Sequence, residues 1–471
     1  MKNILNRTQS ICPVCNKSIE AYYVEGEGKV FFEKECSEHG FFRTLAAESA
    51  DDYKEWVKYP VINIPPKQAM TEGDPDDAGC PLYCGTCHNH LQTACCVLID
   101  LTDRCNQHCP YCFALSEMDG DRSGEPTLEE IEAKYDLLLE LGEERPFNIQ
   151  LSGGEPTVRE DLPEIIRMAR DKGFEYVQIN SNGKRLALEE GYAKVLKDAG
   201  ASVIFMQFDG TYDSIYQALR GEPLFEMKKK AIRNCAAAAL PVTLVPTIVG
   251  GVNSQNIGEM MDFLLENVNV VKGIHFQPVS FFGRHPEGSD YPGRISMFGV
   301  LRELERQRPQ FKYEDFCPIA TGHTLCCFYS TYSKEPDGSV KCMLTKKSKE
   351  EGVSCCDAVS CCDATSVDKL EVIKKDRDFV LNKWEIGEQE ECCCDGGASE
   401  CCCESQPEEG LMDMDEFLKY YRQNTFTVTG MAFQDISNID GERVKRCRVQ
   451  VLSPDNRLIP FCAYNTIYRK S

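Results

Sequence analysis

Short apolar runs alternate with helical patterns along the middle of the chain, from Val97 to about residue 307. The runs read VLIDLT, FNIQLSG, YVQINSNG, VIFMQFDG, PVTLVPTIV and GIHFQPVS. The stretch TLEEIEAKYDLLLELG has apolar residues at helical spacing, with Pro126 and Thr127 at its start and Gly142 at its end. Six β/α units in series predict an α/β fold with a parallel sheet curled into a partial (β/α)6 barrel. Functional residues are then expected at the carboxyl ends of the strands.

Charge and hydropathy limit the partners and the location of this chain of 471 residues. Its 52 basic and 75 acidic residues give a formal net charge of -23. Most of such a surface repels a phosphate backbone, so no nucleic-acid partner is expected. The start MKNILNRTQSICPVC lacks the apolar core of a signal peptide, and no apolar run has the length of a membrane span. We expect a cytoplasmic protein with at most peripheral membrane contact, since acidic surfaces avoid anionic headgroups.

Cysteine is the unusual component, with 28 residues in a chain that shows no export signal. Reduced thiols are expected in that setting, and their C-x2-C, C-x3-C and C-C spacings favour metal binding over disulfides. Cys235 stands alone in an Ala-rich helical stretch and is predicted to be a small buried hydrophobic residue.

Residues 1–60 are predicted to form a small metal module. Cys12 and Cys15 form a C-x2-C pair, and Cys36 and His39 form a C-x2-H pair; together they supply the two halves of a Cys3His ligand set. The β-like stretch AYYVEGEGKVFFEKE lies between the halves, and the pattern resembles a zinc ribbon or rubredoxin knuckle. Four such ligands predict one closed mononuclear site, for which zinc and iron cannot be separated from ligand identity.

The segment DRCNQHCPYCFA directly follows the first predicted strand and carries Cys105, Cys109 and Cys112. A C-x3-C-x2-C motif alone can belong to a zinc site. A closed structural zinc site takes four ligands, however, and this motif supplies three. A [4Fe-4S] cluster held by three thiolates keeps one iron open for a ligand that is not protein. Three cysteines without a fourth therefore favour a [4Fe-4S] cluster over zinc, with S-adenosylmethionine bound to the open iron.

The same segment resembles the signature of radical S-adenosylmethionine enzymes, including the aromatic residue before the third cysteine. LSGGEPTVRED, after the second strand, resembles the GGEP element of that family. The resemblance implies that Cys105, Cys109 and Cys112 hold the catalytic cluster. It further implies contacts to S-adenosylmethionine from residues beside the cysteines and at later strand ends, namely Tyr111, Phe113, Gly153, Gly154, Glu155, Ser181, Asn182, Asp209, Thr247 and Gln277.

A narrower resemblance covers nearly the whole chain outside residues 348–410. The module CPVC…CSEHG, a second cysteine triplet and the ending GMAFQDISNIDGERVKRCRVQVLSPDNRLIPFCAYN are similar to the archaeal tetraether lipid synthase branch. Members of that branch were earlier described as pterin-methylating enzymes. The resemblance implies a transferase that forms a C–C bond at an unactivated carbon of a lipid-like substrate, with a reducing partner such as a ferredoxin or flavodoxin.

Two alternatives to lipid coupling stay open. One is radical methyl or alkyl transfer to a pterin or to a small molecule that carries a metalloid or a thiol. The other, from a different class, is a cysteine-rich protein that binds metals or metalloids. A binding protein needs no cofactor pocket, so the GGEP element and the polar strand ends argue against it.

One or two auxiliary iron–sulfur clusters are expected around the barrel. Residues 61–96 carry the second triplet, Cys80, Cys84 and Cys87, with Cys95 or Cys96 as a fourth ligand, or alternatively a zinc site with His88 or His90. Residues 308–347 and 411–471 are predicted to form a C-terminal auxiliary-cluster region, in which PDGSVKCM resembles an element of such domains. Its candidate ligands, with buried structural thiols as the alternative, are Cys317, Cys326 or Cys327, Cys342, and Cys447 or Cys462.

Residues 348–410 form an acidic, cysteine-rich insertion between these regions. SCCDA occurs twice, and a triple cysteine also occurs twice, among Gly, Ser, Glu and Asp. Such a composition buries little apolar surface, so a mobile segment is predicted. Its thiols could capture soft ions, form a further cluster or relay, or have no role in turnover.

Overall fold

A computed structural model of the chain describes residues 2–71, 79–116, 122, 124–142, 146–286, 293–344, 420 and 423–469. They form a sheet of four strands and a sheet of twelve, with helices around the larger one. The cysteine-rich insertion predicted over residues 348–410 lies outside the described residues.

All six predicted strand runs are strands of the larger sheet, and they pair in parallel in chain order. The predicted α/β fold with a parallel sheet is therefore confirmed. The fifth run is divided into two short strands. The bounds are β5 Cys96–Thr102, β6 Asn148–Gly153, β7 Val177–Ser181, β8 Val203–Gln207, β9 Val242–Val245, β10 Thr247–Ile248 and β11 Val271–Pro278.

The C-terminal part of the chain extends this sheet at both edges. On one edge β14 (Thr425–Met431) pairs in parallel with β11, and β12 (Cys327–Lys334) and β13 (Val340–Cys342) follow as antiparallel strands. On the other edge β15 (Val449–Leu452) is parallel to β5, and β16 (Leu458–Pro460) is antiparallel to β15. The added strands cover edges that would otherwise expose unpaired backbone groups.

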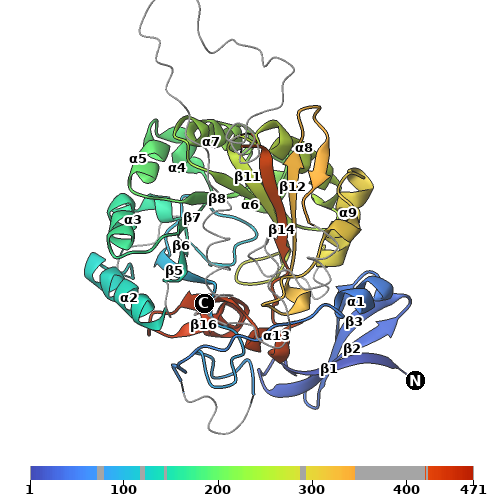
Figure 1. The fold of residues 1–471 in the computed structure, drawn as a ribbon. Coiled ribbons are helices and arrows are strands. Elements are labelled where there is room, and N and C mark those ends of the chain that lie inside the picture. The colour runs from blue at the N-terminus through green and yellow to red at the C-terminus, as the bar shows by residue number, and fades with distance from the viewer. Residues whose placement is uncertain are drawn as a thin grey trace, which may run out of the picture.

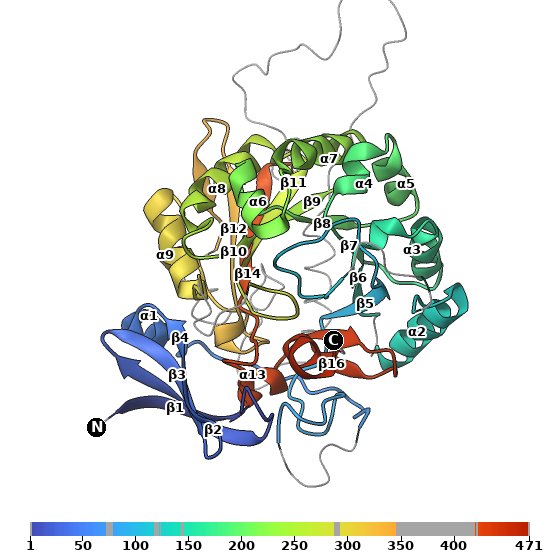
Figure 2. The same cartoon turned by 180° about the vertical axis from the view of Figure 1, so that it is seen from behind.

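Helices lie around the outside of the curved sheet, as Figures 1 and 2 show from opposite sides. Val97, Ile99 and Leu101 of β5 pack in the core on this helical side. The helix α2 (Leu128–Leu141), which follows β5, begins and ends as predicted: Thr127 and Glu130 form a capping box, and Gly142 is the C-cap. The helix bounds are α2 Leu128–Leu141, α3 Leu162–Asp171, α4 Lys184–Leu188, α5 Tyr192–Asp198, α6 Asp213–Arg220, α7 Phe225–Ala237, α8 Ile257–Glu266 and α9 Met297–Gln307. Cys235 is buried in α7, as predicted.

The N-terminal residues form a separate antiparallel sheet of four strands, followed by α1 (Ala50–Trp56). Its strands are β1 Asn3–Ile11, β2 Ser18–Gly26, β3 Lys29–Cys36 and β4 Gly40–Ala47. This sheet lies beside the short helix α13 (Gly441–Lys445) of the C-terminal part (Figure 1). The short helix α14 (Phe461–Ala463) follows β16. The buried carboxylate of Asp440 accepts hydrogen bonds from Thr8 and, at 2.8 Å, from Tyr23, and these join the two parts.

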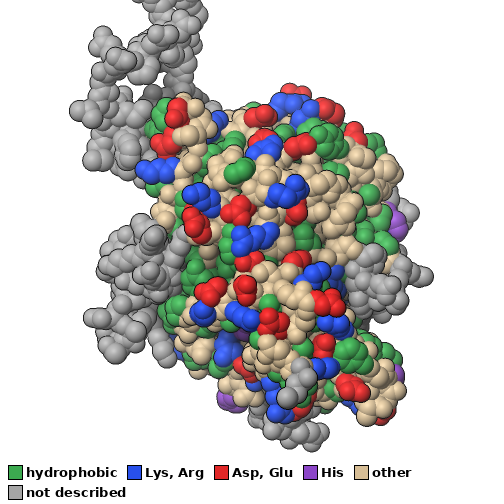
Figure 3. Space-filling view, turned by 90° about the vertical axis from the view of Figure 1, so that its right-hand side faces the viewer, with side chains coloured by type: hydrophobic (Ala, Val, Ile, Leu, Met, Phe, Trp, Pro, Cys, Tyr) green, Lys and Arg blue, Asp and Glu red, His purple; other side chains and the backbone are tan. Residues whose placement is uncertain are grey.

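Charged side chains of both signs are mixed on the face seen in Figure 3, with no large area of positive charge. Within the ranges that the structure describes, no helix has the length and apolar character needed to cross a bilayer.

Candidate active site

The loop after β5 brings Cys105, Cys109 and Cys112 together at the carboxyl end of the sheet. All three are half-buried, and Cys109 and Cys112 lie close enough to Cys105 for their thiolate forms to raise its pKa. Burial raises the pKa of Cys105 to about 12 and also raises the pKa of Cys109. Without a metal Cys105 and Cys109 are thiols, so binding of iron has to release their protons.

Two glycines seat the GGEP turn against the start of this loop. The amides of Gly154 and Glu155 donate to the carbonyls of Thr102, at 2.7 Å, and Arg104, at 2.9 Å. A Cβ atom would lie 2.3 Å from the Thr102 carbonyl oxygen at Gly153 and 2.2 Å from that of Arg104 at Gly154. Only glycine permits such an approach, and Gly153 also has a φ of 117°. The two amides are therefore used to hold the loop.

Glu155 connects the ends of β6 and β7 from a position that is 1% exposed. Its carboxylate accepts from the Ser181 hydroxyl at 2.9 Å and from the Asn182 amide at 2.6 Å. It also accepts from the hydroxyl of Thr157 at 2.6 Å. Burial raises the pKa of Glu155, while these donors act in the opposite direction. The carboxylate orients Ser181, the last residue of β7, and Asn182, which follows it; the sequence predicted both to contact the cofactor.

Asn182 links β7 to the cysteine loop. Its side-chain amide donates to Asn106 at 2.7 Å and lies 3.9 Å from the Cys105 sulfur. Its carbonyl accepts from the ammonium group of Lys228 on α7, which also donates to Gln207 at 3.0 Å. Lys228 is 1% exposed, and burial lowers its pKa to about 8. The sequence motifs did not single out Lys228.

Asp209 and Thr247 lie at neighbouring strand ends, as predicted, and both contact a residue that no sequence motif indicated. Arg220 of α6 donates twice to the Asp209 carboxylate, at 2.7 Å each, and once to the Thr247 hydroxyl at 3.0 Å. A further bond at 2.9 Å reaches the Tyr111 carbonyl, inside the cysteine loop. Gln277 is the parallel partner of Thr247 across β10 and β11.

The two aromatic residues beside Cys112 face different surroundings. Tyr111 packs against a small core cluster that includes Val249 and Phe281. Phe113 is 38% exposed, and its ring centroid lies 5.8 Å from that of Phe461. Phe113 is therefore the more accessible of the two to a ligand in the loop.

The side chain of Gln107 indicates whether the cysteine loop fits an iron–sulfur cluster. This residue, between the first two cysteines, is 2% exposed, yet neither polar atom of its amide has a hydrogen-bond partner among the described residues. Such an amide costs about 1–3 kcal/mol when left without partners. Three thiols and an unsatisfied buried amide in one loop fit an iron–sulfur cluster, whose sulfides accept hydrogen bonds.

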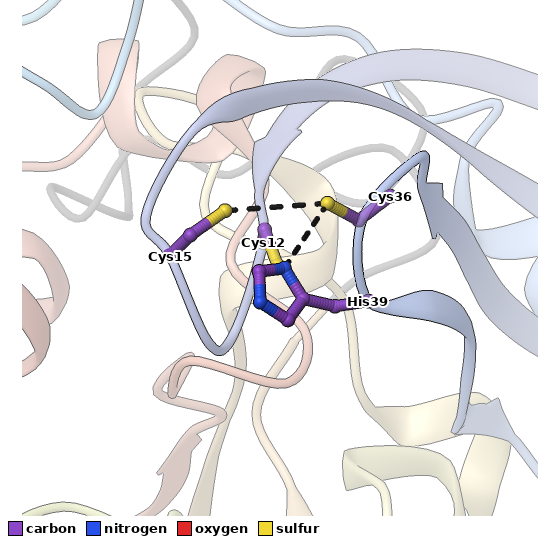
Figure 4. A group of neighbouring side chains, drawn as sticks. All are labelled: Cys12, Cys15, Cys36 and His39. Atoms are coloured by element: carbon purple, nitrogen blue, oxygen red, sulfur yellow. Dashed lines mark hydrogen bonds between the residues drawn. The ribbon is translucent and has the colours of Figure 1, made fainter.

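A second site lies in the N-terminal module, where four side chains point toward one another (Figure 4). The ligand atoms of Cys12, Cys15, Cys36 and His39 all lie within 4.8 Å of one another. The His39 Nδ1 atom is 3.6 Å from the Cys12 sulfur and 3.5 Å from that of Cys36. Zinc–sulfur bonds of about 2.3 Å in a tetrahedron place sulfurs about 3.8 Å apart. The predicted four-residue set is thus gathered at the spacing of one metal ion.

The cysteines of the second triplet are neighbours, but their sulfurs are not gathered as closely as the ligand atoms of the N-terminal site. The charges of Cys80 and Cys87 act on Cys84, whose pKa is raised by burial. Cys96 lies elsewhere, at the start of β5, next to Cys95. His90, an alternative ligand, is near the Cys447 carbonyl and the Gln450 amide at 3.0 Å each, and burial lowers its pKa to about 4. Its ring is thereby occupied in other contacts.

The predicted C-terminal ligands divide into two groups. Cys326, Cys447 and Cys462 act on one another electrostatically, and the Arg443 guanidinium lies 3.5 Å from the Cys326 sulfur. The other candidates have different neighbours. Cys327 is buried, with Cys326, Cys95 and Arg448 nearby; Cys317 pairs with the backbone of Tyr329, and Cys342 is 3.7 Å from Ser330. The geometry thus gathers Cys326, where the sequence had favoured Cys327.

Comparisons with known proteins place this site in a family. A profile of the radical SAM superfamily matches residues 99–264, and a profile of the HMPTM N-terminal zinc ribbon domain matches residues 4–48. The 7,8-dihydro-6-hydroxymethylpterin dimethyltransferase of Methanocaldococcus jannaschii is 34% identical, over 98% of this chain and 94% of that protein. The chain belongs to the radical SAM superfamily. Within it, the chain is similar to that dimethyltransferase over nearly the whole length of both, so this radical SAM protein is an enzyme with a [4Fe-4S] cluster and S-adenosylmethionine.

Other matches are partial. A probable GTP 3′,8-cyclase of Methanothermobacter thermautotrophicus is 32% identical over 37% of this chain and 55% of that protein. The structure of Streptococcus suis SuiB bound to its precursor peptide SuiA covers 66% of this chain and 70% of SuiB at 12% identity, with a TM-score of 0.39. The sequence matches show the superfamily, but they do not show the tetraether synthase branch expected from the sequence.

Proposed function

We propose that this enzyme uses a radical site at Cys105, Cys109 and Cys112 to transfer methyl groups to a pterin-like substrate. The observation that carries the proposal is the 34% identity to a pterin dimethyltransferase over 98% of the chain. It supports the methyl-transfer alternative over the lipid coupling expected from the sequence. When bound, the cluster and S-adenosylmethionine supply reductive cleavage of a carbon–sulfur bond and hence a carbon radical.

The residues around the loop hold and orient these groups. Cys105, Cys109 and Cys112 would ligate three irons of the cluster. Phe113, together with Ser181 and Asn182, would contact S-adenosylmethionine from the loop and from the β7 end. Glu155 fixes the positions of those two β7 residues. The other predicted contacts are backbone groups or strand-end side chains, namely Tyr111, Gly153, Gly154, Asp209, Thr247 and Gln277.

The inner face of the sheet supports a polar substrate. Leu151 and Ile179 pack in the core on the helical side, so Gln150 and Asn180, their neighbours in β6 and β7, face the interior. Both are half-buried, and their side chains approach to 3.4 Å. His275 of β11 is also half-buried, 2.8 Å from the Thr429 hydroxyl. Amide and imidazole groups suit the ring nitrogens of a pterin better than a hydrocarbon chain.

Auxiliary clusters are part of the proposal. Cys80, Cys84 and Cys87 would hold one, and Cys326, Cys447 and Cys462 would hold the other. Zinc or iron would occupy the N-terminal site. A low-potential one-electron carrier such as a ferredoxin or flavodoxin would reduce the enzyme.

The test supplies reconstituted, dithionite-reduced enzyme with S-adenosylmethionine carrying a labelled methyl group and with 7,8-dihydro-6-hydroxymethylpterin. Pterin that carries labelled methyl groups, with S-adenosylhomocysteine and 5′-deoxyadenosine, is the expected result. 5′-Deoxyadenosine without methylated pterin would exclude this substrate, and coupled chains from added archaeal-type lipids would restore the lipid hypothesis.

A further inference from the structure

Arg220 occupies an unusual position for an arginine at the end of a helix. It is the last residue of α6, and its guanidinium is turned inward, leaving the residue 7% exposed. Two nitrogens bind the Asp209 carboxylate, one of these also reaches the Thr247 hydroxyl, and the third nitrogen donates to the Tyr111 carbonyl. One side chain thus fastens the cysteine loop to the segments that follow β8 and β9.

The contact to Tyr111 places positive charge beside the predicted cluster ligands. Tyr111 immediately precedes Cys112 and lies two residues after Cys109. Asp209, which is 0% exposed, binds the guanidinium through its Nε and one terminal nitrogen, while the other terminal nitrogen donates to the Tyr111 carbonyl. The pair therefore forms a buried dipole whose positive end contacts the cysteine loop. Buried charges interact strongly because the surrounding dielectric constant is low.

We propose that Arg220 is a positioning residue of the radical site, which fixes the loop between Cys109 and Cys112 and raises the reduction potential of the cluster held there. The Asp209 carboxylate orients the guanidinium and opposes its charge. Nearby charge and hydrogen bonding are established determinants of cluster potential. The inference rests on the proposed cluster at the three cysteines and is independent of the substrate.

Three variants separate this role from a purely structural one. Arg220→Met removes the positive charge, Asp209→Asn removes the negative charge and keeps the guanidinium, and Arg308→Met is the matched control. Arg308 pairs with Asp262 on α8, at 2.8 Å, away from the cysteine loop. Each reconstituted protein is titrated with dithionite in the absence of S-adenosylmethionine, and the reduced cluster is followed by electron paramagnetic resonance. Iron and sulfide per chain are measured on the same samples.

The expected shifts have opposite signs. The potential falls in Arg220→Met, rises in Asp209→Asn and stays at the wild-type value in Arg308→Met. Arg220→Lys retains the charge without the fork of donors, so its potential is expected between those of the wild type and Arg220→Met. Opposite shifts exclude a purely structural role, since simple loosening of the loop would lower iron content in both variants without reversing the sign.

Several results would overturn the inference. A shift of the same sign in Arg220→Met and Asp209→Asn would do so, as would unchanged potentials in both. If Arg220→Met does not fold, the potentials of Asp209→Asn and Arg220→Lys test the inference in its place. A fall in the potential of Asp209→Asn contradicts the inference. Failure of the wild-type protein to assemble a cluster at the three cysteines would instead overturn the proposed function, and this inference with it.

Discussion

The Ser181 hydroxyl donates a hydrogen bond to the buried Glu155 carboxylate at 2.9 Å, which joins the carboxyl end of β7 to that of β6. The GGEP turn therefore does two things in this fold. Its glycines allow the backbone to approach the cysteine loop, and its glutamate fixes the β7 residues that border the same loop.

Glu155→Gln should weaken use of S-adenosylmethionine. The amide keeps the size of the side chain but replaces an acceptor oxygen with a donor, opposite the Asn182 amide or the Ser181 hydroxyl. A hydrogen bond to a charged group is worth about 1.5–3 kcal/mol, so kcat/KM for 5′-deoxyadenosine formation should fall about 10- to 100-fold. Iron content should stay at the wild-type level. An unchanged kcat/KM would contradict this role of Glu155.

Asp440→Ala should loosen the N-terminal module. The substitution leaves the hydroxyls of Thr8 and Tyr23 without their buried acceptor, at a cost of about 1–3 kcal/mol for each group. Urea denaturation followed by intrinsic fluorescence measures the loss. Asp337→Asn, at an exposed hairpin turn, is the control and should change stability by less than about 0.5 kcal/mol. Equal effects of the two substitutions would contradict the docking contact.

The free energy of unfolding should depend on pH through the buried ammonium group of Lys272. Burial lowers its pKa to about 8 from an ordinary value near 10.5, so between these values the unfolded chain binds more protons than the folded one. Folding stability from this group rises with pH in that window, by at most about 1.4 kcal/mol per pH unit. The wild type should therefore gain stability relative to Lys272→Met between pH 8 and pH 10, as measured by urea denaturation at each pH. A difference that is independent of pH would show that the lysine is not buried in this way.

Adjacent cysteines provide a matched test of the C-terminal site. Cys326→Ala should lower the iron content per chain, because Cys326 is the one that lies near Cys447 and Cys462. Cys327→Ala should leave the iron content at the wild-type level. Both variants should still cleave S-adenosylmethionine if the radical site is independent. The reverse order of iron loss would favour the ligand set expected from the sequence.

Local sequence patterns predicted the strands and the helix starts because their signals are local. Apolar runs identified the six parallel strands, and the residues Thr127 and Gly142 marked the ends of α2. The edge strands were not recognised as part of the same sheet, since Gly273 pairs with Thr427, more than a hundred residues later. Pairing over such a distance leaves no pattern in either segment alone.

The sequence predicted the site residues that belong to a motif, and it missed those whose role depends on burial in the folded protein. Cysteine spacing and the GGEP element located the loop, whereas Arg220 and Lys228 read as ordinary polar positions on amphipathic helices. Adjacent residues such as Cys326 and Cys327 cannot be ranked from the sequence, because neighbouring side chains at a strand start point in different directions.

The most direct measurement is 5′-deoxyadenosine formation by the anaerobically reconstituted, dithionite-reduced enzyme and by its Cys105→Ala, Cys109→Ala and Cys112→Ala variants. The three cysteines lie in a loop outside the core strands, so each variant should fold and keep the metal of the N-terminal module. The wild type should cleave S-adenosylmethionine, and each variant should form no product above the level without enzyme. Cleavage at near the wild-type rate by any one of the three would contradict the assignment of the radical site to this loop.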